Sequence, residues 1–348
     1  MSNDTRQIEQ TRFLGVGAWR FLLAGLVAAS HLWAHMLQGY AAFAVFAFFV
    51  LSGYLMTFVL MHKYGTGARG LADFAFNRII RIYPSYYVAL VLGVITIVVM
   101  TDRGIDLTKL NPEFHLPMSG WEWLQPLTLL PIFGRNGLPV AVSNALSIEI
   151  GAYLLMPLFA RWRVMAWAGV LVSLIAIARY GVTSETFAPR YSEFLPCLIA
   201  FATGSLLAHY REHLLAFVMP KTSVIVWMLH GASWLLISSW PWNDGLYVSI
   251  VLSAWVTLSL TAYKSTRADV LLGDLSYPVY LVHTIVGAYF VSLLGADRSF
   301  AFFAASFSGT ILLSYLMTVL VERRMHARKR RSVIHDDQSA LASQPGVA

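Results

Sequence analysis

The chain has 348 residues, of which 57% are hydrophobic and only 12% are charged, and its mean hydropathy is +0.62. Soluble domains carry about 25% charged residues, so this composition excludes an ordinary soluble protein and indicates an integral membrane protein. The formal net charge of +7 does not require a nucleic-acid partner, because the placement of basic loops beside a membrane explains most of it. We therefore expect the protein to lie in a lipid bilayer and to bind no nucleic acid.

Ten apolar segments follow one another along the chain, with polar stretches between them. A helix needs about 20 apolar residues to cross a bilayer, so we expect an all-α polytopic bundle with about ten transmembrane helices. The segments are, in order, residues 19–37, 41–61, 82–100, 144–160, 164–180, 194–209, 222–239, 246–263, 271–294 and 299–321.

Basic residues are distributed unequally between the expected loops. If the N-terminus is cytoplasmic, eighteen of the 25 Lys and Arg residues lie on the cytoplasmic side, six lie on the other side, and Arg20 lies inside a span. This three-to-one bias follows the positive-inside rule. It places both termini in the cytoplasm.

The same pattern divides the chain into three parts. We expect a polar leader over residues 1–18, one membrane domain over residues 19–323, and a basic, then disordered, cytoplasmic tail over residues 324–348. Within the membrane domain, the polar stretch at residues 121–133 is expected to be re-entrant or interfacial.

Two ionisable residues, Arg20 and His31, interrupt the first apolar segment. They are eleven positions apart, which is about three helical turns, so both side chains lie on one face and about 16 Å apart along the axis. We expect Arg20 near the cytoplasmic surface and His31 in the outer half of the membrane. His35 follows His31 at the same end of the segment.

Two arginines three residues apart, Arg78 and Arg81, precede the third segment. In a helix they share a face, and two guanidinium groups suit a phosphorylated ligand because each binds phosphate oxygens in a bidentate manner. The alternative is that they only set the topology. Asp274 and Glu322, near cytoplasmic span ends, are candidate partners for these arginines. In the second segment, the small pair Ser52–Gly53 would let a ligand, or another helix, approach closely.

Ionisable residues within spans are energetically costly, so a functional role is the default interpretation. Glu149 lies in the fourth segment, where we expect it toward the outer face and able to orient the imidazole of His31, as the acid of a hydrolase triad does. Tyr280 and His283 share one face of the ninth segment. A lone buried histidine is more often structural, but two histidines in separate spans, together with an acid and arginines, favour a site.

Cys197 is the single cysteine of the chain. An intramolecular disulfide is therefore excluded, and a cysteine nucleophile or a zinc–thiolate site is disfavoured. We expect Cys197 to be packed inside the sixth span. We predict no metal site and no permanently bound cofactor.

Read in order, these residues resemble acyltransferase family 3, polytopic bacterial membrane enzymes that O-acylate glycans and other hydroxylated acceptors. The resemblance covers residues 12–323. The chain departs from the family pattern at Asn144–Ala145, where Trp-Ser is frequent, and at Val282, where an aromatic residue is frequent. The matching landmarks are Arg20 with His31, the run Phe48 to Tyr54, Arg78 and Arg81 followed by Tyr83-Pro84, Leu146-Ser147 with Glu149 and Tyr153, Gly273 with Ser276, Tyr277, Tyr280, Leu281 and His283, and Glu322-Arg323.

This resemblance implies an O-acyltransferase of the bacterial inner membrane, in a stand-alone form without a fused extracytoplasmic hydrolase-like domain. The acyl group, acetyl in most members, would move from cytoplasmic acyl-CoA, a co-substrate, to a glycan or lipid-linked glycan hydroxyl. His31 would act as the general base, with Glu149 as a second catalytic residue. The expected donor-binding residues are Arg20, Arg78 and Arg81, and the expected substrate-binding residues are His35, Ser52, Tyr153, Tyr280 and His283.

Two other functions use the same kinds of residue. A proton-coupled secondary transporter or glycan flippase would use intramembrane His, Glu and Arg side chains as a proton relay, and a scaffold for glycan synthesis would tolerate the loss of Arg78 and Glu149 together. The sequence does not distinguish between exopolysaccharide, lipopolysaccharide, oligosaccharide and secondary-metabolite acceptors. It also leaves the acyl chain length and the oligomeric state open.

Overall fold

The computed structural model describes residues 15–36, 38–132, 136–237, 242–295 and 297–326, and these ranges contain helices and no strand. The predicted all-α fold is therefore confirmed. The long helices are α1 (Val16–Leu32), α2 (Gln38–Val59), α3 (Ala68–Asp102), α5 (Ser143–Arg161), α6 (Arg163–Tyr180), α8 (Phe194–Leu214), α9 (Pro220–Leu236), α10 (Trp242–Thr261), α11 (Arg267–Leu294) and α12 (Phe300–Met317). The short elements are η1 (Leu60–Tyr64), η2 (Leu107–Lys109), α4 (Leu124–Thr128), α7 (Phe187–Ser192), η3 (Leu215–Phe217), η4 (Thr318–Glu322) and α13 (Arg323–His326).

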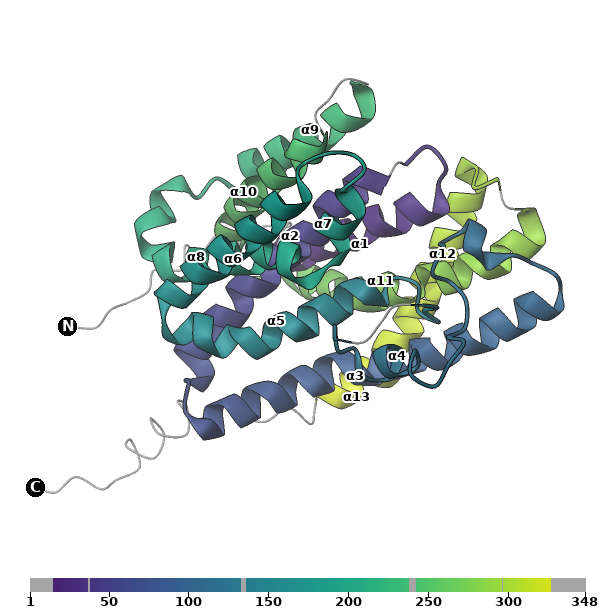
Figure 1. Cartoon of the computed structure of the whole chain (residues 1–348), viewed down its shortest axis with the longest axis horizontal. Coiled ribbons are helices and arrows are strands. Elements are labelled where there is room, and N and C mark those ends of the chain that lie inside the picture. The colour runs from purple at the N-terminus through teal and green to yellow at the C-terminus, as the bar shows by residue number, and fades with distance from the viewer. Residues whose placement is uncertain (1–14, 37, 133–135, 238–241, 296, 327–348) are drawn as a thin grey trace, which may run out of the picture.

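The long helices form a bundle with α3 along one edge and α9 and α10 along the opposite edge (Figure 1). Helices α1, α2 and α11 lie between these edges, and α1 packs most extensively against α11. The central position of α1 is what brings its polar residues into contact with several other helices.

Each of the ten apolar segments forms one long helix, but fewer of these helices are transmembrane spans by length and composition. Among the described residues, α2, α3, α5, α6, α10, α11 and α12 are long and apolar enough to cross a membrane. The bent pair Phe194–Phe217 and Pro220–Leu236 passes this test only as a unit, with an angle of 108°, and α1 is shorter, with 17 residues. By this test of length and composition, the described residues hold seven candidate spans, or eight with the bent pair, which supports a multi-pass membrane protein.

Helix α1 begins at Val16, before the expected start of the first span at residue 19, because a carboxylate from α11 caps it. Oδ1 of Asp269 accepts hydrogen bonds from the main-chain N–H groups of Gly15 (3.0 Å) and Ala18 (2.8 Å). The first N–H groups of a helix lack intrahelical partners, and a negative charge there also interacts favourably with the helix dipole. A Cβ at Gly17 would lie 1.8 Å from the carbonyl oxygen of Asp269, so this close approach requires glycine.

Replacing Asp269 by alanine is expected to lower the stability of the protein by about 1 to 2 kcal/mol, the usual cost of losing a helix cap. Asp269→Asn keeps a side-chain oxygen that accepts hydrogen bonds, so a smaller loss is expected. The measurement is a denaturant titration of both variants in the same detergent. Equal stability of Asp269→Ala and the wild type would contradict the capping role.

The motif Ser52–Gly53 has two separate roles in the bundle. A Cβ at Gly53 would lie 2.2 Å from the carbonyl oxygen of Phe201 on α8, and a Cβ at Gly204 would lie 2.0 Å from the carbonyl oxygen of Val50 on α2. Helices α2 and α8 therefore approach each other through their glycines, which is the packing interpretation of this motif. The serine faces a cavity instead.

The polar stretch at residues 121–132 contains α4 and is attached to α3, while residue 133 lies outside the described residues. Three tyrosine hydroxyl groups on α3 donate hydrogen bonds of 2.6 to 2.8 Å to consecutive carbonyl oxygens of α4. The donors are Tyr83, Tyr86 and Tyr87, and the acceptors are Thr128, Pro126 and Leu127, respectively.

Candidate functional site

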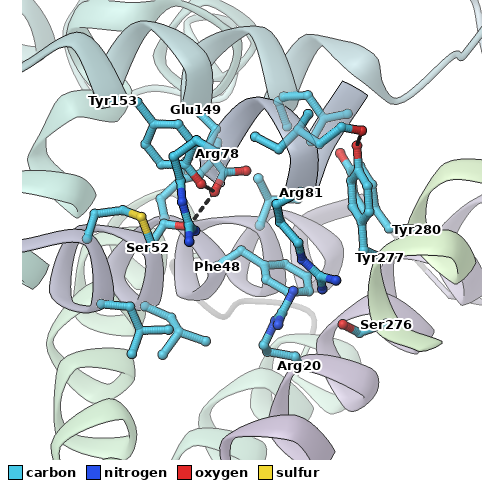
Figure 2. Close-up of a pocket in the computed structure, with 18 residues that line it drawn as sticks. Arg20, Phe48, Ser52, Arg78, Arg81, Glu149, Tyr153, Ser276, Tyr277 and Tyr280 are labelled. Carbon is cyan, nitrogen blue, oxygen red and sulfur yellow. Dashed lines mark hydrogen bonds between the residues drawn. The ribbon is translucent and has the colours of Figure 1, made fainter. Parts of the chain in front are cut away.

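A cavity of about 860 Å³, part of it open to solvent, lies where α1, α2, α3, α5 and α11 meet. Figure 2 shows that the side chains of Arg20, Arg78 and Arg81 all point into it. The structure therefore brings together the three arginines expected to bind the donor. The other polar and aromatic residues of this arginine cavity are Phe48, Phe49, Ser52, Glu149, Tyr153, Ser276, Tyr277 and Tyr280.

The three arginines differ in their partners. Nη1 of Arg81 lies 2.8 Å from Oε2 of Glu322, a buried carboxylate at the end of η4, which confirms one of the expected pairs. Within the described part of the chain, Arg20 and Arg78 form no hydrogen bond or ion pair, and Nε of Arg78 is buried without a hydrogen-bond acceptor. A desolvated guanidinium group is costly unless it is paired. An anionic ligand would supply the missing partner.

Glu149 also faces the arginine cavity, on the side opposite Arg20 (Figure 2). Its carboxylate accepts hydrogen bonds from the hydroxyl groups of Ser52 and Tyr153, two of the expected substrate-binding residues. The expected contact between Glu149 and His31 is not formed, because His31 lines a different cavity. Glu149 lies about 9 Å along α5 from the start of that helix, deep enough to reach the arginines.

The second cavity adjoins the first and has a volume of about 1350 Å³, part of it open to solvent. We call it the histidine cavity, because His31 lines it from the last turn of α1. Val45, Ala145 and Tyr280 line both cavities and so form a wall between them. The other polar and aromatic residues of the histidine cavity are Ser30, Asn111, Glu113, Asn144, Phe187, Tyr191 and Ser192.

His31 is held by contacts from α11 and from the loop that follows it. Its ring centroid lies 5.4 Å from that of His283, a fully buried residue on α11. Nδ1 of His283 lies 3.2 Å from the carbonyl oxygen of Val279, and its Nε2 has no hydrogen-bond partner among the described residues. Arg298 donates a hydrogen bond of 3.3 Å to the main-chain carbonyl of His31. Two histidines singled out in separate segments of the sequence are thus neighbours.

A family model described as an acyltransferase domain (Acyl_transf_3) matches residues 13–319. The chain belongs to this acyltransferase family. The Bacillus subtilis (strain 168) protein named "Putative peptidoglycan O-acetyltransferase YrhL" is 33% identical over 119 residues, which cover 32% of this chain and 18% of that relative. No solved structure matches the chain. The resemblance stated from the motifs is confirmed, and the chain is a member of a family of acyltransferase enzymes.

The remaining expected site residues of this family member lie in different places. Tyr280 is part of the wall, and its hydroxyl group donates a hydrogen bond of 2.8 Å to the carbonyl oxygen of Val142. His35 is exposed, lies beyond the end of α1 and lines neither cavity. Cys197 is fully buried in α8, as expected.

Both departures from the family pattern in α5 line a cavity. Ala145 belongs to the wall, and Asn144 lines the histidine cavity. Its side chain also donates a hydrogen bond of 3.2 Å to the carbonyl oxygen of Ser192 on α7. Asn144 and Ala145 thus line cavities, whereas Val282, the other departure from the common pattern, is fully buried and lines neither cavity.

Several residues that line the cavities were not identified from the sequence. Asn111 and Glu113 line the histidine cavity from the loop after α3. A loop has no helical periodicity, so nothing in the sequence indicated which way these side chains point. Tyr277 lines the arginine cavity and donates a hydrogen bond of 2.9 Å to the carbonyl oxygen of Ile82. In the sequence, only its position three residues before Tyr280, in the same motif, indicated that Tyr277 could line the site.

Proposed function

We propose that this protein is a membrane O-acyltransferase that moves an acyl group, acetyl in the first instance, from cytoplasmic acyl-CoA to a hydroxyl group of an envelope or exported glycan. One observation carries this proposal. The arginine cavity and the histidine cavity adjoin each other across a shared wall, which supports an anionic donor bound beside a histidine that acts as a base.

The donor is assigned to the arginine cavity because of its charge. Arg20 and Arg78 have no anionic partner among the described residues, and guanidinium groups bind phosphate oxygens through paired N–H groups. Arg81 is already paired with Glu322, so it contributes a smaller net charge. We place the phosphates of CoA near Arg20 and Arg78, with the uncharged pantetheine arm directed toward the wall.

Glu149 is assigned to the donor site and not to the base. Its carboxylate accepts hydrogen bonds from Ser52 and Tyr153 and lies in the same cavity as the arginines. A fixed negative charge there attracts the guanidinium groups and limits the positions available to them. We therefore assign Glu149 as a positioning residue for the donor site rather than as the partner of His31.

The acyl transfer step is assigned to His31. Its imidazole accepts the proton of the acceptor hydroxyl group, a role suited to histidine near neutral pH. The hydroxyl oxygen forms the new bond to the acyl carbon, the C–S bond of the thioester breaks, and the departing CoA thiolate takes up the proton. His283, packed against His31, limits the rotation of the imidazole ring.

The acceptor is assigned to the histidine cavity. Asn111, Glu113, Asn144 and Ser192 provide hydrogen-bonding groups, and Tyr191 provides an aromatic ring, a combination that suits a polar ligand with apolar faces such as a sugar. The relative from Bacillus subtilis is named for peptidoglycan, which supports testing peptidoglycan first.

The test uses the purified protein in lipid vesicles with labelled acetyl-CoA and three acceptors: soluble peptidoglycan fragments, an exopolysaccharide and a lipopolysaccharide. The expected result is a base-labile labelled ester on at least one glycan, with release of an equal amount of CoA. Flux of a glycan driven by a pH gradient, without any acylated product, would contradict the proposal and favour a transporter or flippase.

A further inference from the structure

We propose that Val45, Ala145 and Tyr280 form a gate between the two cavities and that this gate restricts the enzyme to short-chain acyl donors. The inference rests on the proposed function, which places acyl-CoA in the arginine cavity and the acceptor hydroxyl group next to His31. The inference adds which residues decide the acyl groups that can move from the arginine cavity to His31.

The position of the gate follows from the lining of the two cavities. The three side chains come from three helices, α2, α5 and α11, and both cavities share them. Val45 is only 3% exposed and Tyr280 only 8% exposed, so the wall is closely packed. An acyl group that moves from the arginines to His31 must therefore pass between these side chains.

Tyr280 is the rigid part of the gate. Its hydroxyl group donates a hydrogen bond to the carbonyl oxygen of Val142, and its ring contacts two other aromatic rings. The centroid of Phe48, which lines the arginine cavity, lies 6.3 Å from the Tyr280 centroid, and the centroid of His283 lies at the same distance of 6.3 Å. Since His283 in turn contacts His31, Tyr280 connects the donor side of the wall to the proposed base.

Val45 and Ala145 set the size of the opening beside this ring. Ala145 has the smallest side chain that still carries a Cβ, and it is only partly buried, so a larger residue would project into the passage. Val45 is buried, and its replacement by alanine would remove both methyl groups from the wall. Protein interiors are packed closely enough for a change of one methylene group to be felt, and one methylene group in an apolar pocket changes enzymatic discrimination by about 10- to 200-fold.

The test compares transfer rates from acetyl-, propionyl-, butyryl- and hexanoyl-CoA to soluble peptidoglycan fragments, measured as release of the CoA thiol. The wild-type rate is expected to fall as the acyl chain lengthens. Val45→Ala is expected to raise the ratio of the butyryl rate to the acetyl rate by about 10-fold. Ala145→Leu is expected to lower the propionyl and butyryl rates relative to the acetyl rate.

A matched control is Val50→Ala, which makes the same change in a fully buried residue of the same helix that lines neither cavity. This variant is expected to keep the wild-type ratio. Val27→Ala tests whether acyl chain length is selected at the gate or inside the histidine cavity. Val27 is also 3% exposed, but it lines only the histidine cavity.

The gate is rejected if Val45→Ala leaves the ratio unchanged, or if Val27→Ala raises it as much as Val45→Ala does. In both cases the proposed function would stand, provided that the wild type transfers acetyl groups. If the wild type transfers no acyl group from any of the four donors to any of the three glycan acceptors named above, the proposed function itself is rejected. Folding of each variant is checked by its circular dichroism spectrum and its thermal unfolding in detergent, so that a misfolded Ala145→Leu protein is recognised and Val45→Ala decides the outcome.

Discussion

Replacing His31 by alanine is expected to lower kcat for acyl transfer by about 100- to 10,000-fold, which is the usual contribution of a general base. The KM for acetyl-CoA is expected to stay near the wild-type value, because His31 lines the histidine cavity and the arginines line the other. The measurement is the initial rate of label transfer from acetyl-CoA to a glycan in lipid vesicles, together with the affinity for free CoA.

The matched control is His35→Ala. His35 lies just beyond the end of α1, is exposed, and lines neither cavity, so its loss is expected to leave the rate close to that of the wild type. A His31→Ala protein that binds CoA and transfers acetyl groups at an undiminished rate would show that the assigned base is not used.

Replacing Arg78 by alanine is expected to raise the KM for acetyl-CoA by about 10- to 100-fold, because a hydrogen bond to a charged group contributes about 1.5 to 3 kcal/mol. Arg78 is a better test of donor binding than Arg81. Removing Arg81 would leave Glu322 buried without its ion-pair partner and would destabilise the protein, whereas Arg78 forms no ion pair in the described part of the chain.

A phosphate-free donor provides the control for this variant. With S-acetylpantetheine, which lacks the phosphates of CoA, Arg78→Ala and the wild type are expected to have the same KM. Arg78→Lys keeps the charge but loses the planar pair of donors, so an intermediate KM for acetyl-CoA is expected. An equal rise in KM for both donors would mean that Arg78 does not act on the phosphates.

Contacts within one helix were predictable from the sequence. Arg20 and His31 lie on α1, and Arg78 and Arg81 lie on α3, because the period of a helix fixes which residues share a face. The all-helical fold followed for the same kind of reason, since only helices or closed barrels satisfy backbone hydrogen bonds inside a bilayer.

Contacts between helices were less predictable, because spacing along one helix does not determine how helices pack against one another. Glu149 was expected beside His31, but α5 directs it into the arginine cavity. The cap of α1 by Asp269 joins residues 254 positions apart, and no local pattern indicates it. Hydropathy detected the apolar segments that form α8 and α9, but it does not indicate the 108° bend between these two helices.

The most direct test of the account is the sidedness of the reaction. Acetyl-CoA and a soluble peptidoglycan acceptor, neither of which crosses a bilayer unaided, are placed on the same side or on opposite sides of vesicles that contain the protein in one orientation. If the acyl group passes from the arginine cavity to the histidine cavity, acylated glycan forms when acetyl-CoA is on the face carrying the C-terminus and the acceptor is on the other face. Product that forms only when both substrates are on the same face would contradict transfer through the gate.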